Sequence, residues 1–375
     1  MVIFNYLRGM IYGLKTFAVI GGLCFFGPKR SSKVPSAAEA GTRRGLSGAT
    51  FWFYLAAGLA TFSSMKPTDF FRQTPGLRLS ALLIACLVSD SNLTAADTLK
   101  LTLQKRVETK AGSGEYRVVT TAEKWDAKQT AIIVCDMWDL HHCLNAVRRA
   151  GEMAPRMNHL LEKARAAGAL IIHAPSGCTK PYDGTPARKR AQDAPKAASL
   201  PADIGSWCKA IPAEEQGKYP IDQSDGGEDD DPLEHQKWAE ELKAKGLNPR
   251  APWTREIEVL KIHDEDAVSD SGVEIWNLLE QRGIQNVILL GVHVNMCVSG
   301  RPFGLRQMAR NGKHVVLMRD LTDSMYNPAM PPKVDHFKGT ALFIDHVEKY
   351  ICPTVTSEQI LGGRKFAFNG GPKTK

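Results

Sequence analysis

The sequence lacks paired cysteine motifs and long hydrophobic runs. None of its eight cysteines forms a C-x-x-C pair, which excludes a zinc ribbon and a small disulfide scaffold. No apolar run reaches the ~20 residues that a confident membrane span needs. Apolar residues make up 43% and charged residues 23% of the 375 residues, so wholesale disorder and collagen-like repeats are excluded as well. A chain of this length and composition can bury a sizeable core.

Excess positive charge is also missing from most of the chain. The net charge is +8, but the first 64 residues contribute +6 and residues 65–95 add +1. The remaining 280 residues carry only +1. Because a nucleic-acid-binding domain needs a basic surface on its folded part, we expect no nucleic-acid partner. The expected partner is a small-molecule substrate, and assembly into a homo-oligomer is left open.

The first 95 residues have the composition of leader and targeting sequence. Residues 1–64 hold two short apolar stretches without periodicity, and we interpret them as a leader or unstructured extension. Residues 65–95 open with a basic segment at Met65 and continue into the apolar stretch 79–88, the arrangement of an export signal. We therefore expect an exported protein, periplasmic or extracellular. An uncleaved membrane tether and a lipid on Cys86 are the alternatives.

From residue 130 onward, apolar runs alternate with segments of helical spacing. Apolar runs predict buried strands over 130–135, 169–173, 286–291 and 314–318, and a further strand is expected over 256–261. Helical spacing predicts helices over 152–168, 233–244, 272–282, 297–310 and 340–350. This alternation predicts an α/β fold, with a parallel sheet of about five or six strands and helices on both faces. A β-hairpin is expected before it, over 96–127.

Residues 175–255 interrupt the alternation. They are rich in proline, contain the acidic run 222–231 and include one short helix. A long irregular segment inside a compact domain is usually functional. We expect this insertion to cover the carboxyl edge of the sheet, where open α/β folds bind their ligands. The domain that it interrupts spans 128–352, and we expect residues 353–375 to form a tail.

Three reactive side chains lie at the carboxyl ends of predicted strands. Asp136 follows the first strand, Lys261 ends the third, and Cys297 begins a helix after the fourth. Parallel strands end at one edge of the sheet, so the three are expected to converge. A thiol becomes nucleophilic beside a base and a helix N-terminus, whose N–H groups also bind an oxyanion. The pattern favours a nucleophilic cysteine site.

Residues 291–298, with the sequence GVHVNMCV, resemble the nucleophile turn of isochorismatase-like cysteine hydrolases. This family includes nicotinamidases and N-carbamoyl amidohydrolases. The Asp-Met pair at Asp136 and the lysine at Lys261 also match its pattern. By this resemblance Cys297 is the nucleophile, Asp136 is the general base, and Lys261 orients the site or stabilises charge. The resemblance also implies the family's three-layer, Rossmann-like fold.

The same resemblance implies local geometry and an activity. The family has a cis peptide after the glycine, here between Val292 and His293, and an oxyanion hole from the backbone N–H groups of Met296 and Cys297. The implied reaction is hydrolysis of a C–N bond in a small amide, ureide or carbamoyl compound through an acyl-enzyme, without a cofactor. Nicotinamidases carry an Asp-x-His metal motif after the second strand. This chain has residues 173–176 (HAPS) there instead, so we expect no metal.

Further residues are candidates for the substrate pocket: Trp138, His142, His293, Arg301 and Tyr326. The adjacent His141 and His142 are also chemically able to bind a metal, but no further ligand lies at a diagnostic spacing. The acidic run 222–231 offers oxygen ligands for Ca²⁺ without EF-hand spacing, and we expect it to be a solvated loop.

Two other function classes remain open on the same fold. A non-catalytic binding protein would use the pocket without the reactive groups, all three of which are present here. A thiol-redox protein would pair Cys297 with a resolving cysteine, and Cys135 and Cys143 are the residues that the fold brings nearest. Protection of Cys297 by an amide substrate distinguishes hydrolysis from redox chemistry.

Overall fold

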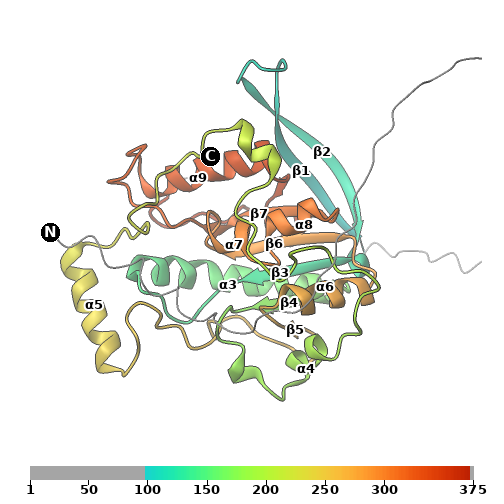
Figure 1. Ribbon diagram of the computed structural model, residues 1–375, viewed down its shortest axis with the longest axis horizontal. Coiled ribbons are helices and arrows are strands. Elements are labelled where there is room, and N and C mark those ends of the chain that lie inside the picture. Colours follow the sequence, from blue (N-terminus) through green and yellow to red (C-terminus); the bar gives the residue numbers. More distant parts are fainter. Residues whose placement is uncertain (1–97, 372–375) are drawn as a thin grey trace, which may run out of the picture. The chain divides into compact units, whose positions relative to one another are not determined.

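The computed structural model describes residues 98–371, so the expected leader, export signal and N-terminal tether lie outside the described residues. One eight-stranded sheet forms the centre, in the order β2-β1-β8-β7-β6-β3-β4-β5 (Figure 1). Its strands are β1 (Thr98–Glu108), β2 (Tyr116–Asp126), β3 (Thr130–Cys135), β4 (Leu170–Ala174), β5 (Ala267–Val268), β6 (Asn286–Val292), β7 (His314–Asp323) and β8 (Thr354–Val355).

The six strands from β8 to β5 run parallel, which confirms the predicted parallel sheet. β3 lies between β6 and β4, and all six of its residues are buried, as expected for a continuous apolar run. The hairpin of β1 and β2 extends this sheet, because β1 pairs with β8 in antiparallel fashion through Gln104 and Thr354. Its tip projects beyond the rest of the described chain (Figure 1).

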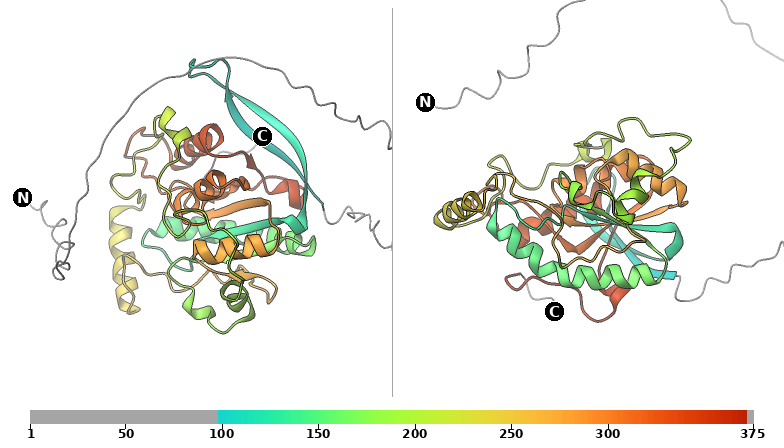
Figure 2. Two further views of the ribbon diagram at one scale, coloured as in Figure 1. Left: turned by 45° about the vertical axis from the view of Figure 1, so that its right-hand side comes forward. Right: turned by 90° about the horizontal axis from the view of Figure 1, so that it is seen from below.

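Helices cover both faces of the sheet. α6 (Gly272–Gln281), α8 (Leu305–Arg310) and α9 (His336–Tyr350) pack on one face. α3 (Leu144–Ala166) and α10 (Glu358–Leu361) pack on the other, and Figure 2 shows α3 running along that face. Because successive side chains of a strand point to opposite faces, Ile133 joins the first hydrophobic cluster and Ile132 the second.

Three expectations about secondary structure are wrong. Residues 256–261 do not form a strand: Glu256 makes only an isolated bridge to Trp138, and the two-residue β5 pairs with β4 in their place. The helix expected over 297–310 is divided into α7 (Cys297–Gly300) and α8, because Pro302 has no N–H to continue a helix. The C-terminal tail contributes β8 to the sheet and α10 to its cover.

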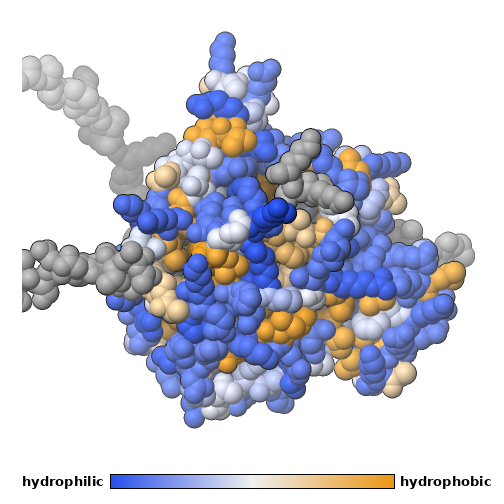
Figure 3. Space-filling model, turned by 180° about the vertical axis from the view of Figure 1, so that it is seen from behind, coloured by the Kyte–Doolittle hydropathy of each residue, from blue (hydrophilic) through white to orange (hydrophobic). Residues whose placement is uncertain are grey.

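The insertion contains α4 (Pro186–Gln192) and α5 (Pro232–Ala244), and the remaining single turns are η3 (Ala127–Gln129), η4 (Lys180–Tyr182) and η5 (Pro212–Gln216). No helix within residues 98–371 combines the length and the apolar character needed to cross a membrane. On the face shown in Figure 3, hydrophobic side chains form scattered patches among hydrophilic ones. That distribution is ordinary for a folded protein in water.

Candidate active site

Asp136 follows β3 with a left-handed backbone (φ 49°), and its side chain is fully buried. The Ser176 N–H donates to Oδ1 at 2.8 Å, and the Arg301 guanidinium donates to Oδ2 from Nε at 3.1 Å and Nη2 at 3.0 Å. Burial raises the pKa of Asp136, while Arg301 and the hydrogen bonds from Cys297 and Ser176 oppose that rise. A carboxylate with a raised pKa is a better proton acceptor, as a general base requires.

Cys297 begins α7 beside this carboxylate and is 7% exposed. Asp136 and Arg301 both act electrostatically on its thiol. Burial and the charge of Asp136 raise the pKa of Cys297 well above its ordinary range, and Arg301 acts in the opposite direction. The resting thiol is therefore protonated, and it becomes a strong nucleophile only by passing its proton to Asp136.

The turn between β6 and α7 requires an unusual backbone. Gly291 has a φ of +104°, and a side chain there would collide with the backbone of Cys135 on β3. Only glycine accepts both conditions without strain. The peptide bond between Val292 and His293 is cis, as the family resemblance implies. The turn thereby brings Cys297 to the carboxyl edge of β3, next to Asp136.

The two predicted oxyanion donors differ in their availability. The Met296 N–H already donates to the carbonyl of His293 at 2.9 Å, because the turn closes on itself there. The Cys297 N–H makes no hydrogen bond within residues 98–371 and lies at the start of α7. This N–H is free to bind a developing oxyanion, whereas that of Met296 would first have to leave His293.

Lys261 is not brought to the other two residues. It lies exposed beside α3, where its N–H donates to Asn158 Oδ1 at 2.8 Å and its Nζ donates to the Glu258 carbonyl at 2.9 Å. Residues 256–261 are not part of the sheet, so the chain does not carry this lysine to the carboxyl edge. The cation beside Asp136 is Arg301, which sequence reasoning placed only in the substrate pocket.

A wall of flat, stacked rings stands close to the reactive residues. Trp138 stacks on Trp253 with ring centroids 4.5 Å apart, and its Nε1 donates to the carbonyl of Ser176 at 3.1 Å. The His141 ring lies 6.1 Å from Trp138 and 5.1 Å from His293. Burial lowers the pKa of His141 well below its ordinary value and that of His293 to about 3, so both rings are uncharged at neutral pH.

Of the other two pocket candidates, His142 borders this wall and Tyr326 lies in the core. The His142 ring lies 4.0 Å from that of His141, and its Nε2 contacts Glu228 at 3.2 Å in the acidic run. Tyr326 is fully buried beneath α9, and its hydroxyl donates to the Met330 carbonyl at 2.8 Å. A glycine at position 339 of α9 makes room for the Tyr326 ring. Tyr326 is therefore a packing residue of the core.

The insertion lies over the nucleophile turn. The Trp207 ring covers the Arg301 guanidinium at 4.7 Å, and the Tyr219 hydroxyl donates to the Asn295 carbonyl at 3.1 Å. Trp207, Tyr219 and Met296 are 46%, 40% and 36% exposed. Three large apolar side chains are thus exposed around Cys297, which gives the approach to the thiol a hydrophobic rim.

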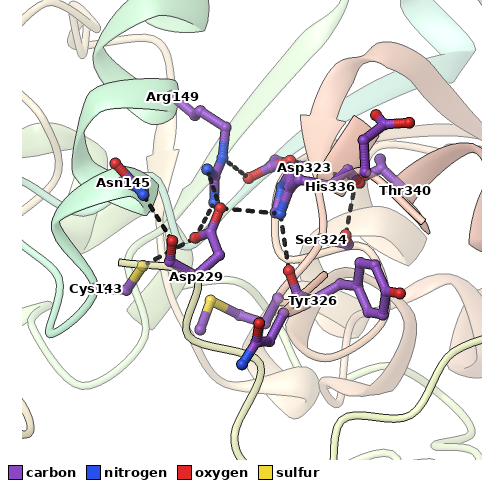
Figure 4. Close-up of polar contacts among 12 residues, drawn as sticks. Cys143, Asn145, Arg149, Asp229, Asp323, Ser324, Tyr326, His336 and Thr340 are labelled. Carbon is purple, nitrogen blue, oxygen red and sulfur yellow. Dashed lines mark hydrogen bonds and ion pairs between the residues drawn. The ribbon is translucent and has the colours of Figure 1, made fainter. Parts of the chain in front are cut away.

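A closed ring of buried charges lies next to the nucleophile turn (Figure 4). Arg149 donates to Asp229 at 2.7 Å and to Asp323 at 2.6 Å, and His336 contacts the same two carboxylates at 3.2 and 2.8 Å. The Asp323 carbonyl accepts the N–H of Val294 in the turn at 2.7 Å. Asp229 comes from the insertion, so this ionic ring (Arg149, Asp229, Asp323 and His336) joins the insertion to the turn.

The ion pairs of this ring favour the charged forms of His336 and Asp323. Burial alone would lower the pKa of His336, but Asp323 outweighs burial and raises it. Burial alone would raise the pKa of Asp323, but Arg149 and His336 hold it far below its ordinary value. The opposite charges of the ring thus outweigh the effect of burial on both residues.

Cys143, Asp229 and Asp230 form the one group in residues 98–371 whose ligand atoms are close enough to hold a metal, all within 4.8 Å. Both carboxylates already have other partners. Asp229 pairs with Arg149, and Asp230 accepts the N–H groups of Leu144 and Asn145 at the start of α3. The acidic run is therefore not a solvated loop, because it caps α3. All six cysteines of the described range are unpaired.

Sequence reasoning missed Ser176, Trp207 and the ionic ring. Ser176 follows β4, the neighbour of β3, so its proximity to Asp136 was open to prediction from strand order. Trp207 gives no comparable signal, because its contact with Arg301 depends on the path of an irregular insertion. The ring likewise joins three distant segments of the sequence.

The chain matches the family model described as the isochorismatase domain over residues 130–330. No curated protein matches it. Among solved structures it is similar to a cysteine hydrolase from Pseudomonas syringae pv. phaseolicola 1448A, with 16% identity, a TM-score of 0.38, and coverage of 63% of this chain and 94% of that one.

Two further solved structures carry the family name. An isochorismatase family protein from Desulfovibrio vulgaris subsp. vulgaris str. Hildenborough has 16% identity, a TM-score of 0.31, and coverage of 58% of this chain and 89% of that one. An isochorismatase from Pseudomonas putida KT2440 has 13% identity, a TM-score of 0.35, and coverage of 62% and 89%. The family model spans more than half of the chain and includes Asp136, Cys297 and Arg301. The chain therefore belongs to the isochorismatase family, and this membership indicates a hydrolase.

Proposed function

We propose that this protein is a cysteine hydrolase that cleaves a C–N bond in a small amide, ureide or carbamoyl compound. The observation that carries the proposal is the Asp136–Arg301 ion pair at the carboxyl edge of the sheet, with the Cys297 thiol in the electrostatic field of both groups. A thiol with a proton acceptor and a cation beside it provides the groups that covalent acyl transfer needs.

The proposed reaction has two halves. In the first, the Cys297 sulfur attacks the carbonyl carbon while Asp136 takes the thiol proton, and the Cys297 N–H binds the oxyanion. Asp136 then gives that proton to the leaving nitrogen as the C–N bond breaks, which leaves a thioester. In the second half, water attacks the thioester, Asp136 takes a proton from the water, and the departing sulfur recovers it. One carboxylate serves each step in turn because it is restored every time.

Arg301 and the wall of stacked aromatic side chains have separate roles in the proposed reaction. Arg301 favours the ionised form of Asp136, which must accept a proton at the start of each half-reaction. The uncharged rings of Trp138, His141 and His293 offer flat surfaces and no net charge. Such a wall suits a neutral, planar substrate group, which an amide or ureide supplies.

The experiment is a screen of amides, ureides and carbamoyl compounds with wild type, Cys297→Ala and Cys352→Ala. Cys352 is the matched control, because it is equally buried and lies outside the contact group. We expect release of ammonia or an amine by wild type and Cys352→Ala, and no turnover by Cys297→Ala. Substantial turnover by Cys297→Ala would refute covalent catalysis.

The thiol-redox alternative has its own test. A substrate from the screen is expected to slow alkylation of Cys297, as it occupies the thiol's approach. A redox thiol would instead form a disulfide with Cys135 or Cys143 under mild oxidants, and peptide mass spectrometry detects that bond. Export stays a separate proposal, supported by the basic and apolar segments of residues 65–95. N-terminal sequencing of the native protein tests it, and a mature start well before Met65 would contradict it.

A further inference from the structure

One segment of the insertion, residues 202–208, is fastened along the helices that follow the nucleophile. The Gln307 side chain on α8 donates to the carbonyls of Asp203 and Ser206 at 2.8 and 2.9 Å. Ile204 is buried, and its carbonyl lies so close to Gly272 of α6 that no larger residue fits there. We call this segment the arm. Its backbone contacts give it a fixed path across the domain.

The arm ends directly over the catalytic cation. The Cys208 N–H donates to the Gly300 carbonyl at 2.8 Å, which fixes the end of the arm on α7. The adjacent Trp207 ring faces the Arg301 guanidinium at 4.7 Å, within the range of a cation–π contact. A Cβ added to Gly300 would lie 2.8 Å from the Trp207 ring, so the absence of a side chain there lets the indole lie flat against the turn.

Trp207 is otherwise hard to explain as a core residue. It is 46% exposed, and its indole makes no hydrogen bond within residues 98–371. A large ring at that position is therefore not required by core packing. Its ordered partners are Arg301 and Gly300, the two residues that end α7.

We propose that Trp207 is a positioning residue that holds the Arg301 guanidinium against Asp136 and Cys297. This inference rests on the proposed function, because it assigns Arg301 to the thiol chemistry. The Arg301 side chain is 22% exposed, whereas Asp136 is fully buried. The indole lies over the guanidinium at 4.7 Å and so limits its movement away from the carboxylate.

The expected consequence concerns the proton affinity of the thiol. The charged or titratable groups that face Cys297 are Asp136 and Cys135 from β3 and Arg301 after α7. Arg301 is the cation among them and the group that favours the thiolate. If Trp207 is removed, Arg301 spends less time beside the thiol, and a higher pH is needed to form the thiolate.

The test is the rate of Cys297 alkylation by iodoacetamide across neutral and alkaline pH, followed by peptide mass spectrometry. This readout needs no substrate. The variants are Trp207→Ala, Trp207→Phe, Gly300→Ala and the double variant Trp207→Ala/Gly300→Ala. Leu233→Ala is the control, because Leu233 is a 70% exposed apolar side chain on α5. Unfolding midpoints of all variants confirm that the folded domain is being compared.

For Trp207→Ala we expect the midpoint of the pH–rate profile to move to higher pH and the rate at neutral pH to fall by about threefold to tenfold. Trp207→Phe keeps a ring and restores most of the rate. Gly300→Ala displaces the indole and mimics Trp207→Ala, but it adds nothing in the double variant because the ring is already gone. Leu233→Ala leaves the profile unchanged.

An unchanged midpoint in Trp207→Ala, or a midpoint moved to lower pH, would overturn the proposal. The second result would mean that Trp207 acts by shielding the thiol from water, because a better solvated thiol ionises more readily. Full additivity of the two substitutions would equally contradict it. Failure of the proposed function would give a different result, because Cys297→Ala would then retain turnover in the substrate screen.

Discussion

The protein contains two buried groups of charges that differ in how completely each charge is paired. In the ionic ring, Arg149 and His336 each contact both Asp229 and Asp323, so every member has two partners of opposite charge. In the second group, of Asp136, Cys297 and Arg301, the cation is Arg301, and it is partly exposed. The pKa of Asp323 is accordingly lowered and that of Asp136 raised, although both are fully buried. Complete pairing fixes structure, whereas incomplete pairing leaves a carboxylate able to exchange a proton.

The largest expected effect comes from the incompletely paired carboxylate. Asp136→Asn removes the proton acceptor and keeps the shape, so kcat falls by about 100- to 10,000-fold. Because burial disfavours the charged form of Asp136, the free energy of unfolding stays the same or rises. Steady-state kinetics and urea unfolding measure both quantities. If Asp136→Asn kept its activity and lost stability, Asp136 would be a structural carboxylate like those of the ionic ring.

Removal of a carboxylate from the ring is expected to affect stability first. Asp323→Ala leaves Arg149 and His336 with one partner fewer in a buried site, and it lowers the free energy of unfolding by about 3–5 kcal/mol. Urea unfolding at neutral pH measures the loss. His159→Ala, at an exposed position of α3, serves as the control. A loss below ~1 kcal/mol for Asp323→Ala would show that the ring does not hold the fold.

The ring also predicts a direction for the dependence of stability on pH. The pKa of His336 is raised in the folded protein above its ordinary value of 6.5. Its contribution to stability is therefore fully present below pH 6.5 and is lost as the pH rises through the raised folded pKa. The difference in unfolding free energy between wild type and His336→Gln should shrink over that interval. A difference that grows with rising pH would contradict the assigned ion pair.

The smallest expected effect separates the two candidate cations. Lys261→Ala changes the free energy of unfolding by less than about 0.5 kcal/mol, because Lys261 is exposed and bonds only to a nearby carbonyl. It should leave kcat within about twofold of wild type, well inside the ~100-fold or greater effect expected of a proton-transfer residue. Arg301→Met, measured in the same assay, should lose far more activity. If Lys261→Ala lost more activity than Arg301→Met, Lys261 and not Arg301 would be the residue that stabilises charge.

The central fold could be predicted because its strands carry strong local signals. The strands β3, β4, β6 and β7 are largely buried on both faces, and such strands have continuous apolar sequences that can be recognised directly. The two-residue β5 leaves no such pattern, whereas Ile257, Val259 and Leu260 favour a strand over 256–261 that does not form. The same expected strand puts Lys261 at the carboxyl edge.

The reactive pair could be predicted, but its cation could not be assigned with the same certainty. Asp136 follows β3 directly, and Cys297 follows β6 after the turn at residues 293–296, so the pairing of these two strands brings both residues to one edge. Arg301 reaches Asp136 because Pro302 ends α7 and turns the chain, and a continuous helix had been expected there. The contacts of Trp207 and Asp229 depend on the insertion, whose irregular path has no periodicity to read.

The central claim is that Cys297 is the covalent nucleophile. Its most direct test is to quench wild-type enzyme with acid during turnover of a substrate from the screen and to weigh the peptide that contains Cys297. We predict that this peptide gains the mass of the substrate's acyl or carbamoyl group, that the gain is removed by hydroxylamine, and that Cys352→Ala shows the same adduct. Turnover with no adduct on Cys297, together with retained activity in Cys297→Ala, would contradict the account.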